Sequence, residues 1–516
     1  MNKLDMKSEN IIDDNIEYIR KKFPNVVVES EQGYAIDFNT LKQELSNIII
    51  DDTKEKYQLT WPGKKEALVT ANTPTTNTLR PLKEKSINFD TTENIYIEGD
   101  NLEALKILQE SYLGKIKCIY IDPPYNTGND FIYNDNFSKD LNQELLDSGQ
   151  IDEEGNRLVV NNQSNGRFHS DWLSMMYPRL KLARNLLTTD GIIFISIDDF
   201  ELNNLRKICD EIFGDENFVA ICPRKTRGSA TTKSDAELQK LNDYIVIYWK
   251  NKEFAKFNLK VVGQKKYPYQ DDRGQYYTVP LQDNGPHGTR SARPNLFYPI
   301  YQTKDNRLVL NRETENDIKF IPDKHKNDDG RWMWSKEKFE KDWKDLCIKN
   351  GKVCIKHYYN KNEDQNQYRR EKNWFDEYLN AKGTISLNNI IGVKGIFDNP
   401  KPVELIKLLI KMSTKDNDII MDFFSGSATT AQAVLDINAE DKTSRKFIMV
   451  QLPEECQENT EAYKNGFKTI CDIGEERIKR AGEKLEQEKQ VNIDYGFRVY
   501  KIDSSNMKDI YYKPKE

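Results

Sequence analysis

The 516-residue chain has few of the residues that metal centres and disulfide frameworks need. Its seven cysteines include no Cys-x2-Cys pair, and its four histidines lie far apart. Zinc sites are usually built from closely spaced cysteine and histidine ligands. We therefore expect no metal site, and we expect the cysteines to be reduced thiols in a reducing compartment.

Long apolar runs are missing as well. No stretch is long enough to cross a bilayer, and the first residues are rich in Lys, Asp and Glu, without the apolar core of a secretion signal. The Gly-x4-Gly-Lys-Ser/Thr pattern of a phosphate-binding loop does not occur. These absences predict a cytoplasmic protein with no membrane contact and no ATP hydrolysis of its own.

The chain also lacks an excess of positive charge. The 77 basic and 83 acidic residues give a net charge of −6, so there is no overall attraction to nucleic acid. A DNA-binding surface would have to come from basic clusters, one around Arg224 and Lys225 and another between residues 349 and 382. Solvated charge explains such clusters equally well, although the aromatics interleaved with the second one favour nucleic acid.

The most informative feature present is Asp122-Pro123-Pro124-Tyr125, which follows the apolar run 118–121. The exocyclic amine of adenine is a poor nucleophile because its lone pair is delocalised into the ring. A carboxylate from Asp122 and a backbone carbonyl beside Pro123 can accept its two hydrogens and free that lone pair. The two prolines stiffen the loop, and the ring of Tyr125 offers a stacking surface for a base rotated out of a duplex.

The same four residues also suit a tight turn after any buried strand, so the context has to decide. Residues 417–422 predict a second strand, and the small-residue turn 423–430 then leads into an apolar helix. Such a turn lets the backbone approach a ligand at the carboxyl end of a strand, where open α/β sheets bind nucleotides. Taken alone, an ordinary structural turn is an equally good interpretation.

Strands and helices alternate around these two features. This rhythm predicts a parallel sheet. It breaks down between about residues 219 and 390, where aromatics, glycines and mixed charges prevail. The expected strands are 95–98, 117–121, 191–197, 417–422 and 446–452, and the expected helices are 102–109, 172–187, 201–212, 402–412 and 430–436.

Together these features resemble the DNA amino-methyltransferases that use S-adenosylmethionine, with Asp-Pro-Pro-Tyr as the catalytic loop and Phe-x-Gly-x-Gly as the cofactor turn. Because the catalytic loop comes first in the chain, the arrangement is similar to the β class, a circularly permuted version of the fold. The surrounding sequence is similar to the modification subunit of type III restriction-modification systems. That likeness runs from about Leu59 to the C-terminus and includes residues 61–65, 99–105, 120–128 and 446–454.

The resemblance implies an α/β fold with a permuted Rossmann-like sheet. Within it we expect four parts. They are a helical N-terminal arm that serves dimerisation (1–85), the catalytic half of the methyltransferase domain (86–218), an inserted mixed α+β target-recognition domain (219–390), and the cofactor-binding half with a C-terminal helix (391–516).

The resemblance also assigns residues. The catalytic ones are Asp122, Pro123, Pro124 and Tyr125. Those expected to bind S-adenosylmethionine are Asp100, Asn126, Lys401, Pro402, Asp422, Phe424, Gly426, Thr429, Gln451 and Glu454.

Two positions depart from the family pattern. Ala428 replaces the second glycine of the cofactor turn, and Gln451 replaces the acidic residue that usually binds the ribose, although Glu454 is near. Both departures put the cofactor affinity in question. Two of the assigned sites have ordinary alternatives, because Asp100 also suits a helix N-cap and Lys401-Pro402 also suits a helix start.

The implied function is site-specific methylation of the N6 amine of adenine in double-stranded DNA. The alternatives are cytosine-N4 methylation and a DNA-recognition subunit without turnover. Asp122 favours adenine, because the cytosine-N4 branch more often has Ser at that position. The resemblance further implies a homodimer and a separate helicase-nuclease partner.

Overall fold

The computed structural model describes residues 11–30, 33–46, 59–128, 131–133, 158–160, 166–229, 238–489 and 493–504. These residues form two compact units. The first combines Met1–Asn258 with Glu371–Glu516, and the second is Leu259–Arg370.

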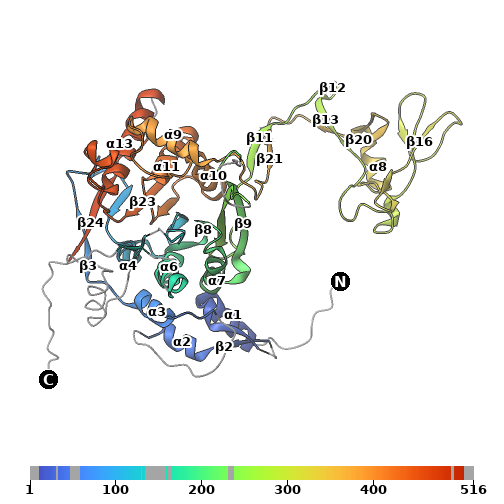
Figure 1. The fold of residues 1–516 in the computed structure, drawn as a ribbon. Helices are drawn as coiled ribbons and strands as arrows, with labels where there is room; N and C mark the ends of the chain where they lie inside the picture. Colours follow the sequence, from blue (N-terminus) through green and yellow to red (C-terminus); the bar gives the residue numbers. More distant parts are fainter. Residues whose placement is uncertain are drawn as a thin grey trace, which may run out of the picture. The chain divides into compact units, whose positions relative to one another are not determined.

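A nine-stranded mixed sheet forms the centre of the first unit (Figure 1). Its middle six strands are parallel, as the alternation of strands and helices predicted, and an antiparallel partner closes one edge and an antiparallel pair the other. In spatial order the strands are β3 (Asn77–Pro81), β24 (Arg498–Ser504), β4 (Ile95–Glu98), β23 (Lys446–Gln451), β22 (Ile419–Asp422), β5 (Ile116–Ile121), β8 (Leu187–Ile197), β10 (Asn242–Trp249) and β9 (Phe218–Lys225).

Alternate residues of the central strands enter two different hydrophobic cores. In β5, Ile119 and Ile121 join the core on one face, whereas Cys118 and Tyr120 join the core on the other. Strands buried on both faces become apolar throughout, which is why residues 118–121 form a continuous apolar run.

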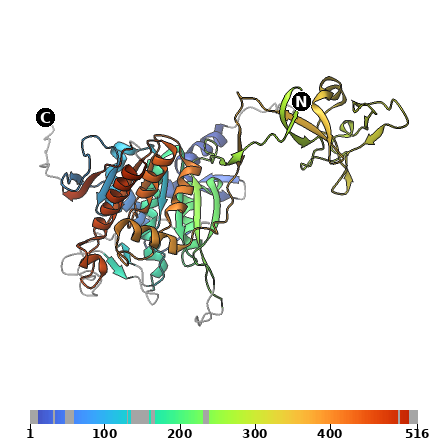
Figure 2. The ribbon, with the colours of Figure 1, turned by 90° about the horizontal axis from the view of Figure 1, so that it is seen from above.

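Helices cover both faces of this sheet (Figures 1 and 2). The first core takes side chains from α4, α6 and α7, and the second takes them from α10, α11 and α13. These helices are α4 (Asn101–Tyr112), α6 (Phe168–Leu186), α7 (Leu202–Phe213), α10 (Val403–Ser413), α11 (Thr429–Asp441) and α13 (Ile470–Lys489). The remaining elements of the second half are α9 (Asn380–Ile391) and α12 (Glu461–Lys464).

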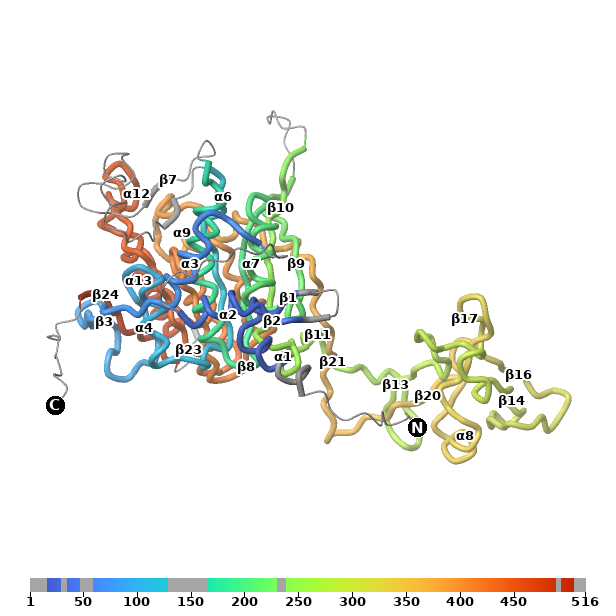
Figure 3. Tube along the Cα trace, turned by 90° about the horizontal axis from the view of Figure 1, so that it is seen from below, coloured from blue at the N-terminus to red at the C-terminus, as the bar shows by residue number. Residues whose placement is uncertain are grey.

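The N-terminal part consists of short helices and a hairpin that pack beside α6 and α7 (Figure 3). Arg20 of the first helix forms ion pairs with Asp215 and Glu216, at 3.2 Å and 3.0 Å. The elements are α1 (Ile11–Lys22), β1 (Val27–Ser30), β2 (Gly33–Ile36), α2 (Phe38–Glu44) and α3 (Lys64–Asn72).

The second unit is mixed α+β and has its own core around Tyr298, Trp332 and Phe339. It is narrower than the 219–390 range expected from the sequence, because β9 and β10 belong to the large sheet. Those two strands pair antiparallel with each other, and this departs from the alternation of strands and helices on which the boundary was based. Its elements are β11 (Lys260–Gln264), β12 (Tyr269–Asp271), β13 (Gly274–Pro280), β14 (Ile300–Gln302), β15 (Leu308–Val309), β16 (Ile318–Phe320), β17 (Lys324–His325), β18 (Asp328–Asp329), α8 (Lys336–Asp342), β19 (Leu346–Lys349), β20 (Lys352–Tyr358) and β21 (Asn366–Arg369).

Two further short strands, β6 (Phe131–Tyr133) and β7 (Leu158–Val160), pair with each other. Across the described part of the chain, no helix combines the length and apolar character needed to span a membrane.

Candidate active site

The two sequence features meet at the carboxyl ends of two central strands of the large sheet. This end of the parallel strands is called the sheet edge below. Strand β22 pairs in parallel with β5, so that Ile420 lies opposite Cys118 and Met421 opposite Ile119. Asp122 directly follows β5 and Asp422 is the last residue of β22. The carboxyl ends of neighbouring parallel strands therefore place the Asp-Pro-Pro-Tyr loop beside the small-residue turn.

Only one of the two oxygens of the Asp122 carboxylate has a hydrogen-bond partner among the described residues. Its Oδ2 atom accepts a hydrogen bond from the ammonium group of Lys401, which precedes α10. Its Oδ1 atom is buried and has no hydrogen-bond partner among the described residues. A buried carboxylate oxygen without a partner is costly unless something donates to it. This atom is thus the acceptor in the loop that is available to a ligand.

The loop after Asp122 is anchored through its backbone. The indole N–H of Trp172, a fully buried residue of α6, donates to the carbonyl of Pro124 over 2.8 Å. The side-chain amide of Asn126 donates to Glu201 over 2.6 Å and to the carbonyl of Phe168 over 3.2 Å. Asn126 has a φ of 59°, in the left-handed region that asparagine tolerates well. The structure thus shows Asn126 turning the chain out of the loop.

Glu201 is a buried hub beside this loop. Besides Asn126, it accepts from the amide of Asn204 over 2.7 Å, and its Oε1 atom lies 2.6 Å from Nδ1 of His169. Its exposed fraction is 0%. Hydrogen bonds from several donors compensate for the buried charge, and they hold the end of the loop against α6 and α7.

The ring of Tyr125 is anchored at its tip. Its hydroxyl donates to Oδ2 of Asp243 on β10 over 3.3 Å. The ammonium group of Lys401 lies 5.1 Å from the ring centroid, which is a cation–π distance. Tyr125 therefore contacts side chains from two elements far from it in the sequence.

Asp422 shapes the small-residue turn. Its carboxylate accepts from the backbone N–H of Phe424 over 3.1 Å and from the hydroxyl of Thr430 over 2.6 Å. Burial raises the pKa of Asp422 to about 7, and the negative charge of Asp122 acts in the same direction.

The turn itself is tight. Gly426 has a φ of +51°, and a Cβ atom there would lie 3.2 Å from Cζ of Phe397. Its N–H donates to Oε1 of Gln451 over 2.7 Å. Ala428 has a φ of 57° and is fully buried. A residue with a Cβ in this left-handed conformation is strained by roughly 1–2 kcal/mol. This strain is the cost of having Ala428 where the family pattern has its second glycine.

Arg477 of α13 binds the small-residue turn through hydrogen bonds. This arginine is fully buried, and one of its terminal nitrogens donates to the hydroxyls of Ser427 and Thr429 over 2.9 Å and 2.7 Å. Burial lowers its pKa to about 9. Arg477 was not identified from the sequence. The signal was its spacing, four residues after Ile473 and four before Ala481, both of which are buried.

Two further parallel strands extend the same edge. Strand β23 pairs with β4, with Gln451 opposite Glu98. Asp100 follows β4 and caps α4, accepting from the N–H groups of Leu102 and Glu103 over 2.9 Å and 3.1 Å. The structure thus shows the N-cap role for Asp100.

Gln451 and Glu454 lie side by side after β23. The amide of Gln451 donates to Oε1 of Glu454 over 3.3 Å, and burial raises the pKa of Glu454 to about 7. Pro402 precedes α10 as its N-cap residue, so Lys401-Pro402 does start a helix. The structure therefore brings Asp100, Gln451, Asp422 and Asp122 to one sheet edge.

The prediction that Arg224 belongs to an exposed basic surface was wrong. Arg224 is fully buried, and its guanidinium holds Asp243 through Nε over 2.8 Å and through a second nitrogen. Inside a sheet, an arginine is retained because an acidic partner compensates for it, and the sequence does not reveal that partner. The second basic cluster stays a prediction.

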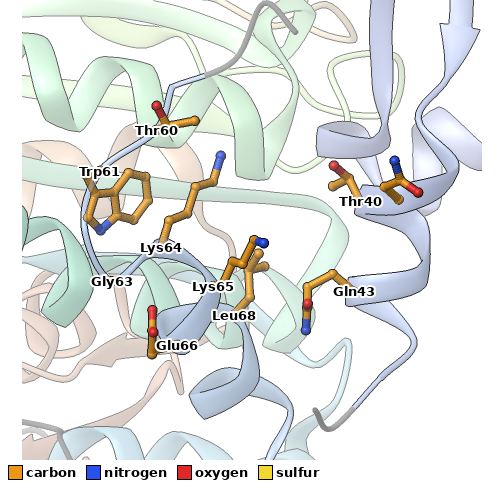
Figure 4. A pocket seen from close by; sticks show the side chains of 10 residues that line it. Thr40, Gln43, Thr60, Trp61, Gly63, Lys64, Lys65, Glu66 and Leu68 are labelled. Carbon is orange, nitrogen blue, oxygen red and sulfur yellow. The ribbon is translucent and has the colours of Figure 1, made fainter. Parts of the chain in front are cut away.

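A pocket and a cluster of acidic side chains are further candidates for a binding site. A pocket of about 280 Å³ in the N-terminal part contains none of the predicted site residues (Figure 4). Glu98, Asp472 and Glu475 lie close enough together to hold an ion, but the ammonium group of Lys85 already pairs with all three. The pocket is lined by Asn39, Thr40, Gln43, Thr60, Trp61, Gly63, Lys64, Lys65, Glu66 and Leu68.

Comparison with known proteins gives a consistent picture. A family model described as DNA methylase matches residues 116–465. The type III restriction-modification enzyme EcoPI Mod subunit of Escherichia phage P1 is 33% identical over 481 residues, covering 89% of this chain and 74% of that protein. The EcoP15I Mod subunit of Escherichia coli is 32% identical over 490 residues, covering 90% and 74%.

A type II enzyme is related as well. The methyltransferase M.KpnI of Klebsiella pneumoniae is 33% identical over 404 residues, covering 77% of this chain and 89% of that protein. Among solved structures, the PvuII cytosine-N4-specific DNA methyltransferase matches with a TM-score of 0.35 at 13% identity, covering 75% of this chain and 93% of that one, and we infer nothing from so weak a likeness. The chain belongs to the DNA methylase family, together with the Mod subunits of type III restriction-modification enzymes.

Proposed function

We propose that this protein transfers a methyl group from S-adenosylmethionine to the N6 amine of an adenine flipped out of double-stranded DNA, as the modification subunit of a type III system. The observation that carries the proposal is the buried, unpartnered Oδ1 of Asp122, at the sheet edge that also holds the small-residue turn. The Mod subunits among its relatives support the assignment to a type III system.

Asp122 and the loop backbone activate the amine. Lys401 holds the carboxylate through Oδ2, which leaves Oδ1 to accept one hydrogen of the amine. Trp172 already donates to the Pro124 carbonyl, so the Pro123 carbonyl is the loop acceptor for the second hydrogen. With both hydrogens held, the nitrogen lone pair points away from the ring. The fixed acceptors need no reorganisation when the reaction begins.

The residues near the turn fit S-adenosylmethionine. The Ser425 hydroxyl is buried and has no partner among the described residues, and the desolvated carboxylate of Glu454 suits the ribose hydroxyls in place of the missing acid at position 451. At Gly426 a Cβ would lie 3.2 Å from the ring of Phe397, so the turn needs a glycine there, and we assign its backbone to the cofactor site. We assign contacts with the cofactor to Asp100, Asn126, Lys401, Pro402, Phe424 and Thr429 as well, whereas Asp422 shapes the turn.

The bound cofactor supplies an electrophilic methyl group on a sulfonium. The chain's contribution is orientation, because Asp122 and the Pro123 carbonyl would hold the amine nitrogen in place for the transfer. Tyr125 stacks against the flipped base. Because the transfer is a direct displacement, no side chain has to act as a covalent nucleophile.

The larger organisation follows from the same assignment. We propose that the chain order of loop and turn reflects the permuted, β-class arrangement, and that the second unit, Leu259–Arg370, reads the DNA target. The N-terminal part serves a homodimer, and a separate helicase-nuclease subunit completes the restriction system.

Incubating purified protein with DNA and isotope-labelled S-adenosylmethionine, followed by digestion to nucleosides, tests this proposal. We expect the label in N6-methyladenine. Label in N4-methylcytosine would replace adenine by cytosine as the substrate. No label at all would indicate a DNA-recognition subunit without turnover.

The variant Asp122→Ala should abolish methylation while cofactor affinity changes little, because it removes the acceptor and leaves the turn intact. Calorimetry of cofactor binding and the nucleoside assay measure the two effects separately. Equal loss of both would show that the carboxylate is structural.

A further inference from the structure

Tyr125, the aromatic residue of the catalytic loop, is bonded to a buried ion pair that lies outside every sequence motif. Its hydroxyl donates to Oδ2 of Asp243 over 3.3 Å. Asp243 has an exposed fraction of 5%, and its two oxygens accept from Nε and a terminal nitrogen of Arg224, which has an exposed fraction of 0%. The ring tip is therefore attached to a carboxylate that has little freedom to move.

Arg224 is itself held on all sides. Its remaining terminal nitrogen donates to the carbonyl of Tyr378 and to Oδ1 of Asn380, each over 2.9 Å. The fork geometry of a guanidinium fixes Asp243 in plane, which a lysine would not do. Strand β10 and the start of α9 thus both bind the guanidinium group that β9 carries.

The Tyr125 hydroxyl remains a donor in this arrangement. Burial, and then the negative charges of Asp122 and Asp243, raise its pKa well above the ordinary value for tyrosine. The neutral hydroxyl donates to this carboxylate over 3.3 Å. Since the loop backbone is anchored at Pro124 and Asn126, this bond adds a restraint on the position of the ring tip, and so on the swing of the side chain about χ1.

We propose that Asp243 is a positioning residue, which holds the Tyr125 hydroxyl and thereby fixes the ring against which the flipped adenine stacks, and that Arg224 holds Asp243 in turn. The inference rests on the proposed function, because it assigns a purpose to the orientation of Tyr125. A base that stacks on a fixed ring presents its amine to Asp122 in one orientation, whereas a mobile ring admits several.

The decisive variant is Tyr125→Phe, which keeps the stacking ring and removes the hydroxyl. Methylation is measured at saturating DNA and cofactor, together with the cofactor Kd and the unfolding midpoint. We expect kcat to fall about 10-fold, as for the loss of a hydrogen bond to a charged group, with the cofactor Kd unchanged. The matched control is Tyr120→Phe on β5, whose buried hydroxyl lies 2.9 Å from Ser196, and it should keep the wild-type kcat.

A double-mutant cycle identifies the partner. If Tyr125 acts through Asp243, adding Asp243→Asn to Tyr125→Phe should lower kcat by less than about twofold more. Multiplying effects of the two substitutions would overturn the role of Asp243. A Tyr125→Phe variant with wild-type kcat would overturn the whole inference, and this second result does not require Asp243→Asn to fold.

The wild-type assay separates this inference from the proposed function. Wild-type protein that fails to form N6-methyladenine removes the proposed function and the inference with it. Active wild-type protein with an unaffected Tyr125→Phe variant removes the inference alone.

Discussion

Among single residues, Asp422 links the site to the pH dependence of stability. Its pKa is raised from 3.8 to about 7 because it is buried at the end of β22. Between those two pH values the folded state binds a proton that the unfolded chain has released. The free energy of unfolding therefore falls as the pH rises through this window, and the loss is complete above about pH 7.

Asp422→Asn should flatten this dependence, because the variant has no proton to release there. Urea unfolding at pH 5 and pH 8 measures the slope in each protein. Glu454, with a pKa of about 7, titrates in the same direction, so some slope remains and Glu454→Gln serves as the parallel variant. Identical slopes in wild type and Asp422→Asn would show that the buried carboxyl does not titrate in this range.

Ala428 tests the departure from the family's glycine. Ala428→Gly relieves about 1–2 kcal/mol of left-handed strain, but it loses a buried methyl worth about 0.8 kcal/mol and gains unfolded-state entropy worth about 0.5–1 kcal/mol. We therefore expect the stability to change by less than about 1 kcal/mol. Chemical denaturation measures this, and a loss above about 2 kcal/mol would mean that the methyl group packs better than the strain costs.

At the level of elements, α6 supports the catalytic loop. Trp172→Phe keeps an aromatic ring in the core but leaves the Pro124 carbonyl without its donor, at a cost of about 1–3 kcal/mol in stability. Because the loop then loses one anchor, kcat should fall while cofactor affinity is kept. Leu180→Val, a buried position farther along the same helix, should cost stability without the fall in kcat. Parallel losses of kcat in both variants would contradict the anchoring role.

The strands show where local patterns suffice. The apolar run 118–121, and the run 447–450 within the expected strand 446–452, predicted strands of a parallel sheet, since a strand buried on both faces is apolar throughout. Strands β9 and β10 were not placed in the sheet, because the pairing of β10 with β8, which also brings β9 to the sheet, joins residues distant in the chain. Arg224 and Asp243 lie on these two strands, so the ion pair between them was not predicted either.

For the whole molecule, the second unit offers a clean test of its role in DNA recognition. Lys260 pairs with Arg369, so the two chain ends that enter and leave the unit lie next to each other. Replacing residues 261–368 by a short Gly-Ser turn should leave the first unit folded and able to bind the cofactor, but without site-specific methylation. Circular dichroism, cofactor calorimetry and methylation mapping measure the three properties. Retained sequence specificity would place target reading in the first unit.

The sequence by itself determined the local backbone of the loop and the turn. Residues 122–125 predict a stiff loop because prolines fix φ, and residues 422–430 predict a tight turn because small residues permit one. The tertiary structure decided which charges meet: Lys401 reaches Asp122, Arg224 is buried with Asp243, and Arg477 holds the turn. Each of these contacts joins side chains distant in the sequence, so it forms only where the packed sheet brings their two segments together.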